Sequence, residues 1–185
     1  VMVATSASSG KTLCYNIPVV ETLSKNRSAR AMYIFPTKAL SQDQGRNLDN
    51  IVSKHRNLRH DIFDGDTPTI ERTDIRRSSR ILITNPDMLH LGILPNHKSW
   101  YAFLRELEYV VIDEAHVYRG VFGSHVSNLL RRLRRICARL GAKPRFVLCS
   151  ATIANPGEHA TNLTGLDFEV IEIDGSPSSG KDFVF

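Results

Sequence analysis

Short, uninterrupted apolar segments separated by amphipathic ones are the feature that most constrains how this chain can fold. Residues 109–113 and 81–84 show no alternation of apolar and polar side chains. Such strands are buried on both faces, as in parallel sheets covered by helices on both sides. Because predicted helices alternate with the strands, we expect an α/β fold with right-handed crossovers. The other expected strands are residues 1–4, 31–35, 60–63, 146–149 and 168–173, and the expected helices are residues 11–24 (with a kink at Pro18), 37–55 and 124–140.

The length and composition indicate one compact domain of a longer protein. The chain has 185 residues, about one domain, of which 42% are hydrophobic and 23% charged, which excludes a disordered tail. No apolar run approaches the roughly 18–20 residues that span a bilayer. The chain start carries neither the basic segment nor the long apolar stretch of a signal peptide, and it lacks an initiator Met. We therefore expect an intracellular fragment with no membrane partner.

Charge and cysteine content narrow the class of protein only slightly. A net charge of +5 permits a polyanionic partner without requiring one. Cys14, Cys137 and Cys149 are far apart, odd in number and without zinc-site spacing. They are expected to be reduced, mostly buried thiols in a reducing compartment.

A phosphate-binding loop is predicted between the first strand and the first helix. The pattern G-x-x-x-x-G-K-[ST] fits the segment except that Thr5 replaces the first glycine. Small residues let backbone N–H groups wrap a phosphate at a helix N-terminus. Lys11 would then pair with the β- and γ-phosphates, and the Thr12 hydroxyl would bind Mg²⁺; the alternative is a serine-rich helix cap with a solvated lysine. The residues expected to hold the nucleotide are Thr5, Ser6, Ala7, Ser8, Ser9, Gly10, Lys11 and Thr12.

A carboxylate pair follows the clearest strand. Asp113 and Glu114 end the apolar run 109–113 and so lie at the edge where α/β sheets bind ligands. Asp113 suits Mg²⁺, and Glu114 suits orienting or deprotonating the attacking water in phosphoryl transfer. The alternative role, a helix N-cap, loses force beside a phosphate loop. We therefore predict that Lys11, Asp113 and Glu114 form a catalytic site for ATP and Mg²⁺.

Several segments, in order, resemble the motifs of superfamily-two DExH-box helicases. The sequence Asp-Glu-Ala-His at 113–116 resembles motif II, and residues 35–44, 84–89 and 150–152 resemble motifs Ia, Ib and III. Residues 64–68, 117–125 and 151–156 resemble one branch, the YprA/MrfA-type helicases, which are kin of eukaryotic RecQ-like repair helicases. The resemblance covers nearly the whole chain.

The resemblance implies a three-layer RecA-like P-loop domain with a mostly parallel sheet. Residues 1–174 would form the ATP-binding domain, truncated at its N-terminus, and residues 175–185 a linker toward a second RecA-like domain. The implied activity is ATP-driven 3′-to-5′ DNA unwinding with a role in crosslink repair. The implied location is the nucleus of a eukaryote, or the cytoplasm or nucleoid of a bacterium. Thr5 departs from the family pattern, and the chain lacks an adenine-reading segment and a second domain with arginine fingers, so we expect this piece alone to be inactive or very weak in ATP turnover.

The resemblance also implies roles for two further groups of residues. His116, Ser150 and Thr152 would couple the nucleotide state to movement along nucleic acid. Hydroxyl and amide groups at strand ends can bind the phosphates of a nucleic-acid backbone, and such contacts position a protein without reading the base sequence. The same residue types are also common wherever a strand is followed by a helix. The residues expected along one strand of DNA are Pro36, Thr37, Lys38, Gly65, Thr84, Asn85 and Asp87.

Two arginine-rich segments have more than one interpretation. Apolar residues within 124–140 recur at three- and four-residue spacing, which predicts an amphipathic helix. Its arginines are interpreted as a solvated face, with a DNA patch or a contact to other domains as the alternatives. The second cluster is interpreted in the same way, with Glu71 and Asp74 neutralising part of it. The arginines are Arg131, Arg132, Arg134, Arg135 and Arg139 in the first segment, and Arg72, Arg76, Arg77 and Arg80 in the second.

The sequence leaves three functions open. The first is the ATP-binding half of a DNA helicase that binds single-stranded DNA. The second is a related motor on RNA or duplex DNA, since no base-reading feature separates these tracks. The third, for this piece alone, is a nucleic-acid-binding module without turnover.

Overall fold

A seven-stranded sheet forms the centre of the chain in the computed structural model, which describes residues 1–6, 10–53, 55 and 57–173. The strand order is β3-β4-β2-β5-β6-β1-β7, and each neighbouring pair is parallel. The α/β prediction is therefore confirmed. The strands are β1 (Met2–Ala4), β2 (Arg30–Ile34), β3 (His60–Ile62), β4 (Ile81–Thr84), β5 (Leu107–Ile112), β6 (Arg145–Ser150) and β7 (Val170–Ile171).

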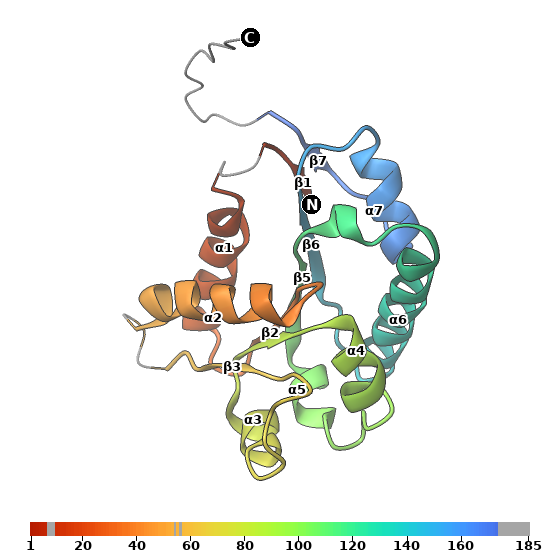
Figure 1. The fold of residues 1–185 in the computed structure, drawn as a ribbon. Helices are drawn as coiled ribbons and strands as arrows, with labels where there is room; N and C mark the ends of the chain where they lie inside the picture. Colours follow the sequence, from red (N-terminus) through yellow and green to blue (C-terminus); the bar gives the residue numbers. More distant parts are fainter. Residues whose placement is uncertain (7–9, 54, 56, 174–185) are drawn as a thin grey trace.

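Helices cover both faces of the sheet. In Figure 1, α1 (Lys11–Lys25) and α2 (Lys38–Val52) lie on one side of the sheet, and α6 (Gly120–Arg139) and α7 (Pro156–Thr164) lie on the other. Alternate side chains of a strand enter opposite layers, so that Tyr33 packs under α1 and α2 while Ile34 packs on the α6 side. Burial on both faces explains why the strands read as continuous apolar runs.

Several short helices lie outside the sequence prediction. They include α3 (Arg72–Ser78), α4 (Pro86–Met88), the π-helical η1 (Leu89–Ile93), α5 (Tyr101–Arg105) and the 3₁₀-helical η2 (Ala115–Val117), together with α7. Segments of three to nine residues are too short to establish an apolar period, so hydrophobic patterning alone does not detect them. None of the helices in the described part of the chain has the length and apolar character needed to cross a membrane.

The predicted element boundaries shift by a few residues. Helix α6 begins at Gly120, four residues before the predicted start, and α1 continues through Pro18 to Lys25. The last strand shortens to Val170–Ile171, because β7 pairs with β1 along one side only. Of the predicted thiols, Cys137 and Cys149 are buried, which raises the pKa of Cys137 to about 12, whereas Cys14 is exposed. The predicted linker 175–185 lies outside the described residues.

Arg80 belongs to the core of the chain and not to a solvated cluster. It is 9% exposed, and its guanidinium donates hydrogen bonds to the carbonyl oxygens of Leu23, Asn26 and Ala29 at 2.8–2.9 Å. These carbonyls lie at the C-terminal end of α1 and in the turn before β2, where helix carbonyls lack partners. The predicted neutralisation also differs, because Asp74 pairs with Arg59 at 2.7 Å. Arg80 therefore fixes the end of α1 to the sheet.

Candidate functional site

The parallel sheet brings the predicted site residues to one edge. The phosphate loop follows β1, the Asp113–Glu114 pair follows β5, and Ser150 ends β6, which lies between these two strands. The residues predicted to contact nucleic acid follow β2, β3 and β4, which are neighbours in the other half of the sheet. The edge therefore has two halves: one carries the residues predicted to hold nucleotide (the nucleotide half), and the other carries the residues predicted to contact nucleic acid (the nucleic-acid half).

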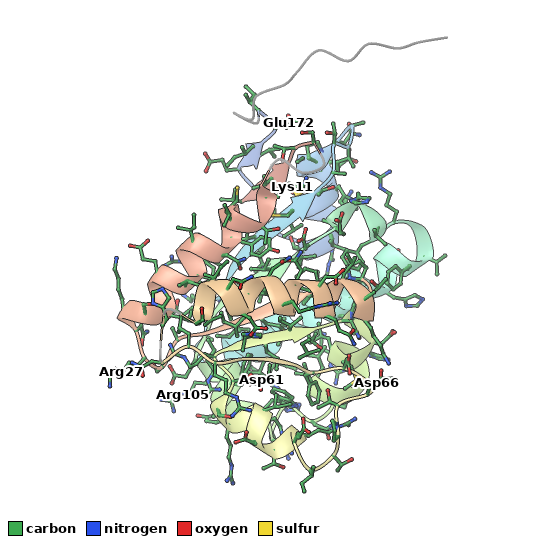
Figure 2. All side chains as sticks on the ribbon, turned by 60° about the vertical axis from the view of Figure 1, so that its left-hand side comes forward. Lys11, Arg27, Asp61, Asp66, Arg105 and Glu172 are labelled. Atoms are coloured by element: carbon green, nitrogen blue, oxygen red, sulfur yellow. The ribbon has the colours of Figure 1, made fainter. Side chains whose placement is uncertain are left out.

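The phosphate loop ends in a left-handed glycine. Gly10 has φ 80° and forms the N-cap of α1, a conformation that L side chains rarely adopt. Lys11 begins the helix, as Figure 2 shows, and its Nζ donates to the carbonyl oxygens of Thr5 and Ser6 at 3.1 and 2.5 Å. Thr12 is half-buried in the first turn. The other predicted loop residues, Ala7, Ser8 and Ser9, lie outside the described residues.

Asp113 is a buried carboxylate held at both oxygens. It is 8% exposed, and its backbone N–H donates to the carbonyl oxygen of Ile34 on β2 at 3.1 Å. Oδ1 accepts the N–H of Glu114 at 2.8 Å, and Oδ2 accepts the Tyr15 hydroxyl at 3.0 Å. Burial raises the pKa of Asp113 and the Glu114 charge raises it further, whereas the two hydrogen bonds and the Lys11 charge lower it. Asp113 follows β5 and Lys11 follows β1, so the two residues lie at the same edge of the sheet with only β6 between their strands.

Glu114 occupies a strained backbone position. Its φ of 51° makes it the one non-glycine residue with positive φ in the described ranges. Such outliers cost about 1–3 kcal/mol and persist where the surrounding structure fixes them. Here the N–H bond to Asp113 and the helix η2 turn the chain directly after the strand. The Glu114 carboxylate stays partly exposed, 3.2 Å from Nδ1 of His116.

Three further residues at this edge were missed from the sequence. Tyr15 lies one helical turn after Lys11 on α1, so helical periodicity could have identified it. The Nε2–H of His159 donates to the Ala115 carbonyl at 2.7 Å, a contact across 44 residues that has no local sequence signal. The Tyr118 hydroxyl is buried and lacks a hydrogen-bond partner among the described residues; burial and then the charges of Asp113 and Glu114 raise its pKa.

The predicted coupling residues differ in exposure. Ser150 is fully buried at the end of β6, and its hydroxyl donates to the Ala151 carbonyl at 2.7 Å. Thr152 is exposed and His116 is half-buried. Ser150 and His116 thus lie after adjacent strands, β6 and β5.

The nucleic-acid half contains one close cluster of predicted residues. Thr37 is the N-cap of α2, and its hydroxyl accepts the N–H of Leu40 at 3.3 Å. The adjacent Lys38 pairs with Asp66 at 2.8 Å, and a Cβ added to Gly65 would lie 3.6 Å from Lys38 Nζ. Figure 2 shows Asp66 beside α2. The exposed Lys38 ammonium group therefore lies where the segments that follow β2 and β3 meet.

Two of the three predicted residues at the end of β4 use their side chains in hydrogen bonds within the fold. The Thr84 side chain is fully buried and donates to the Phe63 carbonyl at 2.8 Å. Asn85 is also buried and caps α4 by accepting the N–H of Met88 at 2.9 Å. Asp87 is exposed, and Pro36 after β2 is half-buried. Thr37, Lys38, Gly65 and Asp87 are thus the predicted contacts with exposed surface.

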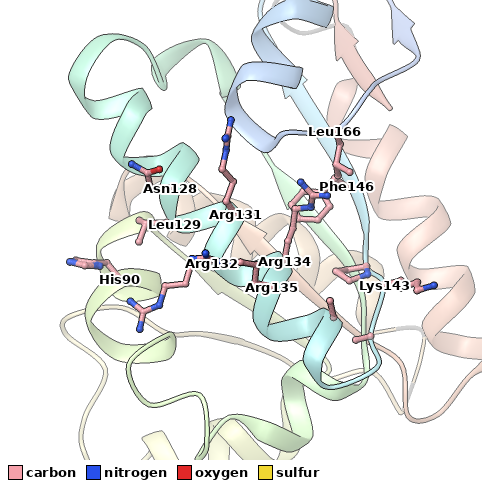
Figure 3. Close-up of a pocket in the computed structure, with 13 residues that line it drawn as sticks. His90, Asn128, Leu129, Arg131, Arg132, Arg134, Arg135, Lys143, Phe146 and Leu166 are labelled. Atoms are coloured by element: carbon pink, nitrogen blue, oxygen red, sulfur yellow. The ribbon is translucent and has the colours of Figure 1, made fainter.

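A basic groove of about 960 Å³ lies on α6, next to the beginning of β6 and away from the edge described above (Figure 3). Arg131 donates to the carbonyl oxygen of Asn162, and Arg134 donates to those of Thr164 and Gly165 at 2.8 and 3.0 Å. These carbonyls end α7, where cations are stabilising. Two of the five arginines therefore link α6 to the end of α7, a contact that the interpretation as a solvated face did not include.

Comparison with known proteins identifies relatives along the whole chain. A family described as DEAD/DEAH box helicase matches residues 1–159. The chain is 48% identical to "Uncharacterized ATP-dependent helicase YprA" of Bacillus subtilis and 49% identical to "ATP-dependent helicase hrq1" of Schizosaccharomyces pombe; both matches cover 100% of this chain, and 25% and 18% of the relatives. A crystal structure of the DUF1998 helicase MrfA bound to DNA and AMPPNP has 47% identity and a TM-score of 0.94 over 96% of this chain and 25% of that one. The chain thus spans a quarter or less of these relatives.

The buried charge of Asp113 predicts a pH-dependent cost to stability. Because the folded-state pKa is raised above the unfolded value, ionised Asp113 lowers the free energy of unfolding once the pH exceeds that unfolded value, about 3.9. Asp113→Asn should therefore stabilise the chain at pH 7.5 without nucleotide or Mg²⁺, and the gain should vanish as the pH falls below 4. Urea unfolding at several pH values measures this difference, with exposed Asp167→Asn as the control. A gain that is equal at low and neutral pH would contradict it.

Proposed function

Because the chain belongs to the DEAD/DEAH box helicase family, we propose that it is the ATP-binding half of a DNA helicase motor. The observation that carries this proposal is that the residues predicted to hold nucleotide and those predicted to contact nucleic acid follow two neighbouring groups of strands at one edge of the sheet. Relatives named ATP-dependent helicases, and the MrfA structure bound to DNA and AMPPNP, support both halves.

Residues of the phosphate loop and the Asp113 turn would hold ATP. Gly10 and the first N–H groups of α1 offer donors to phosphate oxygens at a helix N-terminus. Lys11 now donates to two loop carbonyls, and it would exchange them for the β- and γ-phosphates. The donor set fits a triphosphate. The full proposed set is Thr5, Ser6, Ala7, Ser8, Ser9, Gly10, Lys11, Thr12, Asp113 and Glu114.

The donor set also fits Mg²⁺ bound together with phosphate. No three His, Cys, Asp or Glu side chains of the described residues gather as a protein-only metal site. Mg²⁺ uses one or two carboxylates together with phosphates and water, so Asp113 and the Thr12 hydroxyl suffice. When bound, the ion neutralises charge on the phosphates. Glu114 is partly exposed on its strained turn, and it would orient the attacking water and accept a proton from it.

Three residues of the nucleotide half would link hydrolysis to movement along nucleic acid. Ser150 and Thr152 follow β6, which separates the nucleotide-binding strands β1 and β5. His116 lies 3.2 Å from Glu114, so a change in the Glu114 contact would reach this histidine directly. We assign His116, Ser150 and Thr152 to coupling on this basis.

The nucleic-acid half would follow a single-stranded DNA backbone. Exposed Lys38 supplies charge, and Thr37 and Gly65 supply small polar or backbone groups beside it. Thr84 and Asn85 would contribute mainly through backbone groups, because their side chains serve the fold. Pro36 and Asp87 complete the set. A second RecA-like domain of the parent chain would close over this edge after residues 1–174 and the linker 175–185.

Glu114→Gln in the parent protein should reduce ATP turnover stimulated by single-stranded DNA by roughly 100-fold or more, because proton acceptance from water is lost. ATP binding should persist. Steady-state ATPase and equilibrium nucleotide binding measure the two effects, with Glu108→Gln, near the start of the preceding strand β5, as the control. Unchanged turnover in Glu114→Gln and in Lys11→Ala would contradict the proposed function.

Lys38→Ala should weaken single-stranded DNA binding and reduce its salt dependence. Loss of one phosphate contact lowers the slope of log K against log salt by about 0.7 for single strands. Lys25→Ala is a matched control, since Lys25 is also exposed and also makes one ion pair, with Glu21. An equal slope for both variants would exclude Lys38 from the binding path. Parallel titrations with duplex DNA and RNA identify the preferred track.

A further inference from the structure

Tyr15 places a buried hydroxyl against the Asp113 carboxylate. Its side chain is completely buried under α1 and packs edge-on against Tyr33, with ring centroids 5.3 Å apart and an interplanar angle of 84°. This packing fixes the ring, and therefore fixes where the hydroxyl lies. The hydroxyl is 3.0 Å from Asp113 Oδ2 and 3.5 Å from Gln44 Oε1, so α1, α2 and the end of β5 meet at this atom.

The phenol donates its proton to Asp113 and not to Gln44. A tyrosine hydroxyl has a single proton, and a carboxylate is a stronger acceptor than an amide carbonyl. The Asp113 oxygen is also the nearer of the two by 0.5 Å. Burial and the Asp113 charge raise the pKa of Tyr15, so the hydroxyl stays protonated and remains a donor.

Two donors from different elements therefore fix the plane of the carboxylate. The Glu114 N–H holds Oδ1 from the turn after β5, and the Tyr15 hydroxyl holds Oδ2 from α1. Each oxygen retains a lone pair. We infer that Tyr15 is a positioning residue, which ties the helix bearing Lys11 and Thr12 to Asp113 and presets that carboxylate for the Mg²⁺ of bound ATP. This inference rests on the proposed function.

The nearby Tyr33 provides a matched control within the same aromatic pair. Its hydroxyl is also buried and donates a hydrogen bond to Oδ1 of Asn16 at 2.8 Å, whereas no hydrogen bond joins it to Asp113 among the described residues. Tyr15→Phe and Tyr33→Phe thus each remove one buried hydroxyl under α1 while keeping both rings. A purely structural role predicts similar effects for the two variants.

The test compares the Mg²⁺ requirement of the parent protein with each variant. Loss of groups that orient a metal ligand costs roughly 10- to 100-fold in metal affinity or activity. Tyr15→Phe should raise the Mg²⁺ concentration for half-maximal binding of a fluorescent ATP analogue about tenfold or more. It should leave the weaker, Mg²⁺-free binding unchanged. Tyr33→Phe should leave both unchanged. In an Asp113→Asn background, Tyr15→Phe should have a smaller effect on Mg²⁺-dependent binding than in the parent protein, because its Asp113 partner is then changed.

Three outcomes would overturn the inference. They are an unchanged Mg²⁺ requirement in Tyr15→Phe, equal shifts in Tyr15→Phe and Tyr33→Phe, and an undiminished Tyr15 effect in the Asp113→Asn background. A Tyr15→Phe protein that does not fold would assign the hydroxyl to stability and would also contradict it. Lys11→Ala in the same assay separates the two claims: if that variant binds the analogue normally, the proposed function fails rather than the role of Tyr15.

Discussion

The parallel pairing of all the described strands is the constraint on which the rest of this structure depends. Parallel strands end at the same edge, so residues far apart in sequence, such as Lys11 and Asp113, reach one edge of the sheet without a long loop. The strand order then separates the proposed nucleotide residues, which follow β1 and β5, from the proposed nucleic-acid residues, which follow β2, β3 and β4. A shift of either group to another edge would require a strand to reverse its direction.

The edge of the sheet carries local costs that the rest of the fold offsets. Asp113 keeps a carboxylate in a buried position, Glu114 adopts a left-handed backbone, and the Tyr118 hydroxyl has no hydrogen-bond partner within the described ranges. Strain and imperfect pairing of this kind cluster at functional sites, where geometry matters more than stability. The core below is ordinary by contrast: its strands are apolar on both faces, and Arg80 satisfies carbonyls at the end of α1.

Sequence reasoning predicts what depends on local pattern and misses what depends on distant contacts. The buried strands, α1 and α2, and the two acidic residues after β5 are visible because apolar runs and their polar ends are adjacent in sequence. The Tyr15–Asp113 bond joins residues 98 positions apart, and Arg80 looks like one more arginine of a charged cluster until its partners are known. The short helices between β4 and β5 lack enough turns to show a period.

Diffraction from the parent protein with a non-hydrolysable ATP analogue and Mn²⁺ in place of Mg²⁺ tests the account most directly. The anomalous signal of Mn²⁺ locates the ion independently of any assumption about its ligands. The account predicts one peak between Thr12 and Asp113, with Lys11 Nζ released from the Thr5 and Ser6 carbonyls onto phosphate. A nucleotide-bound peak at another edge of the sheet, an ion away from Asp113, or phosphates away from Lys11 would contradict it.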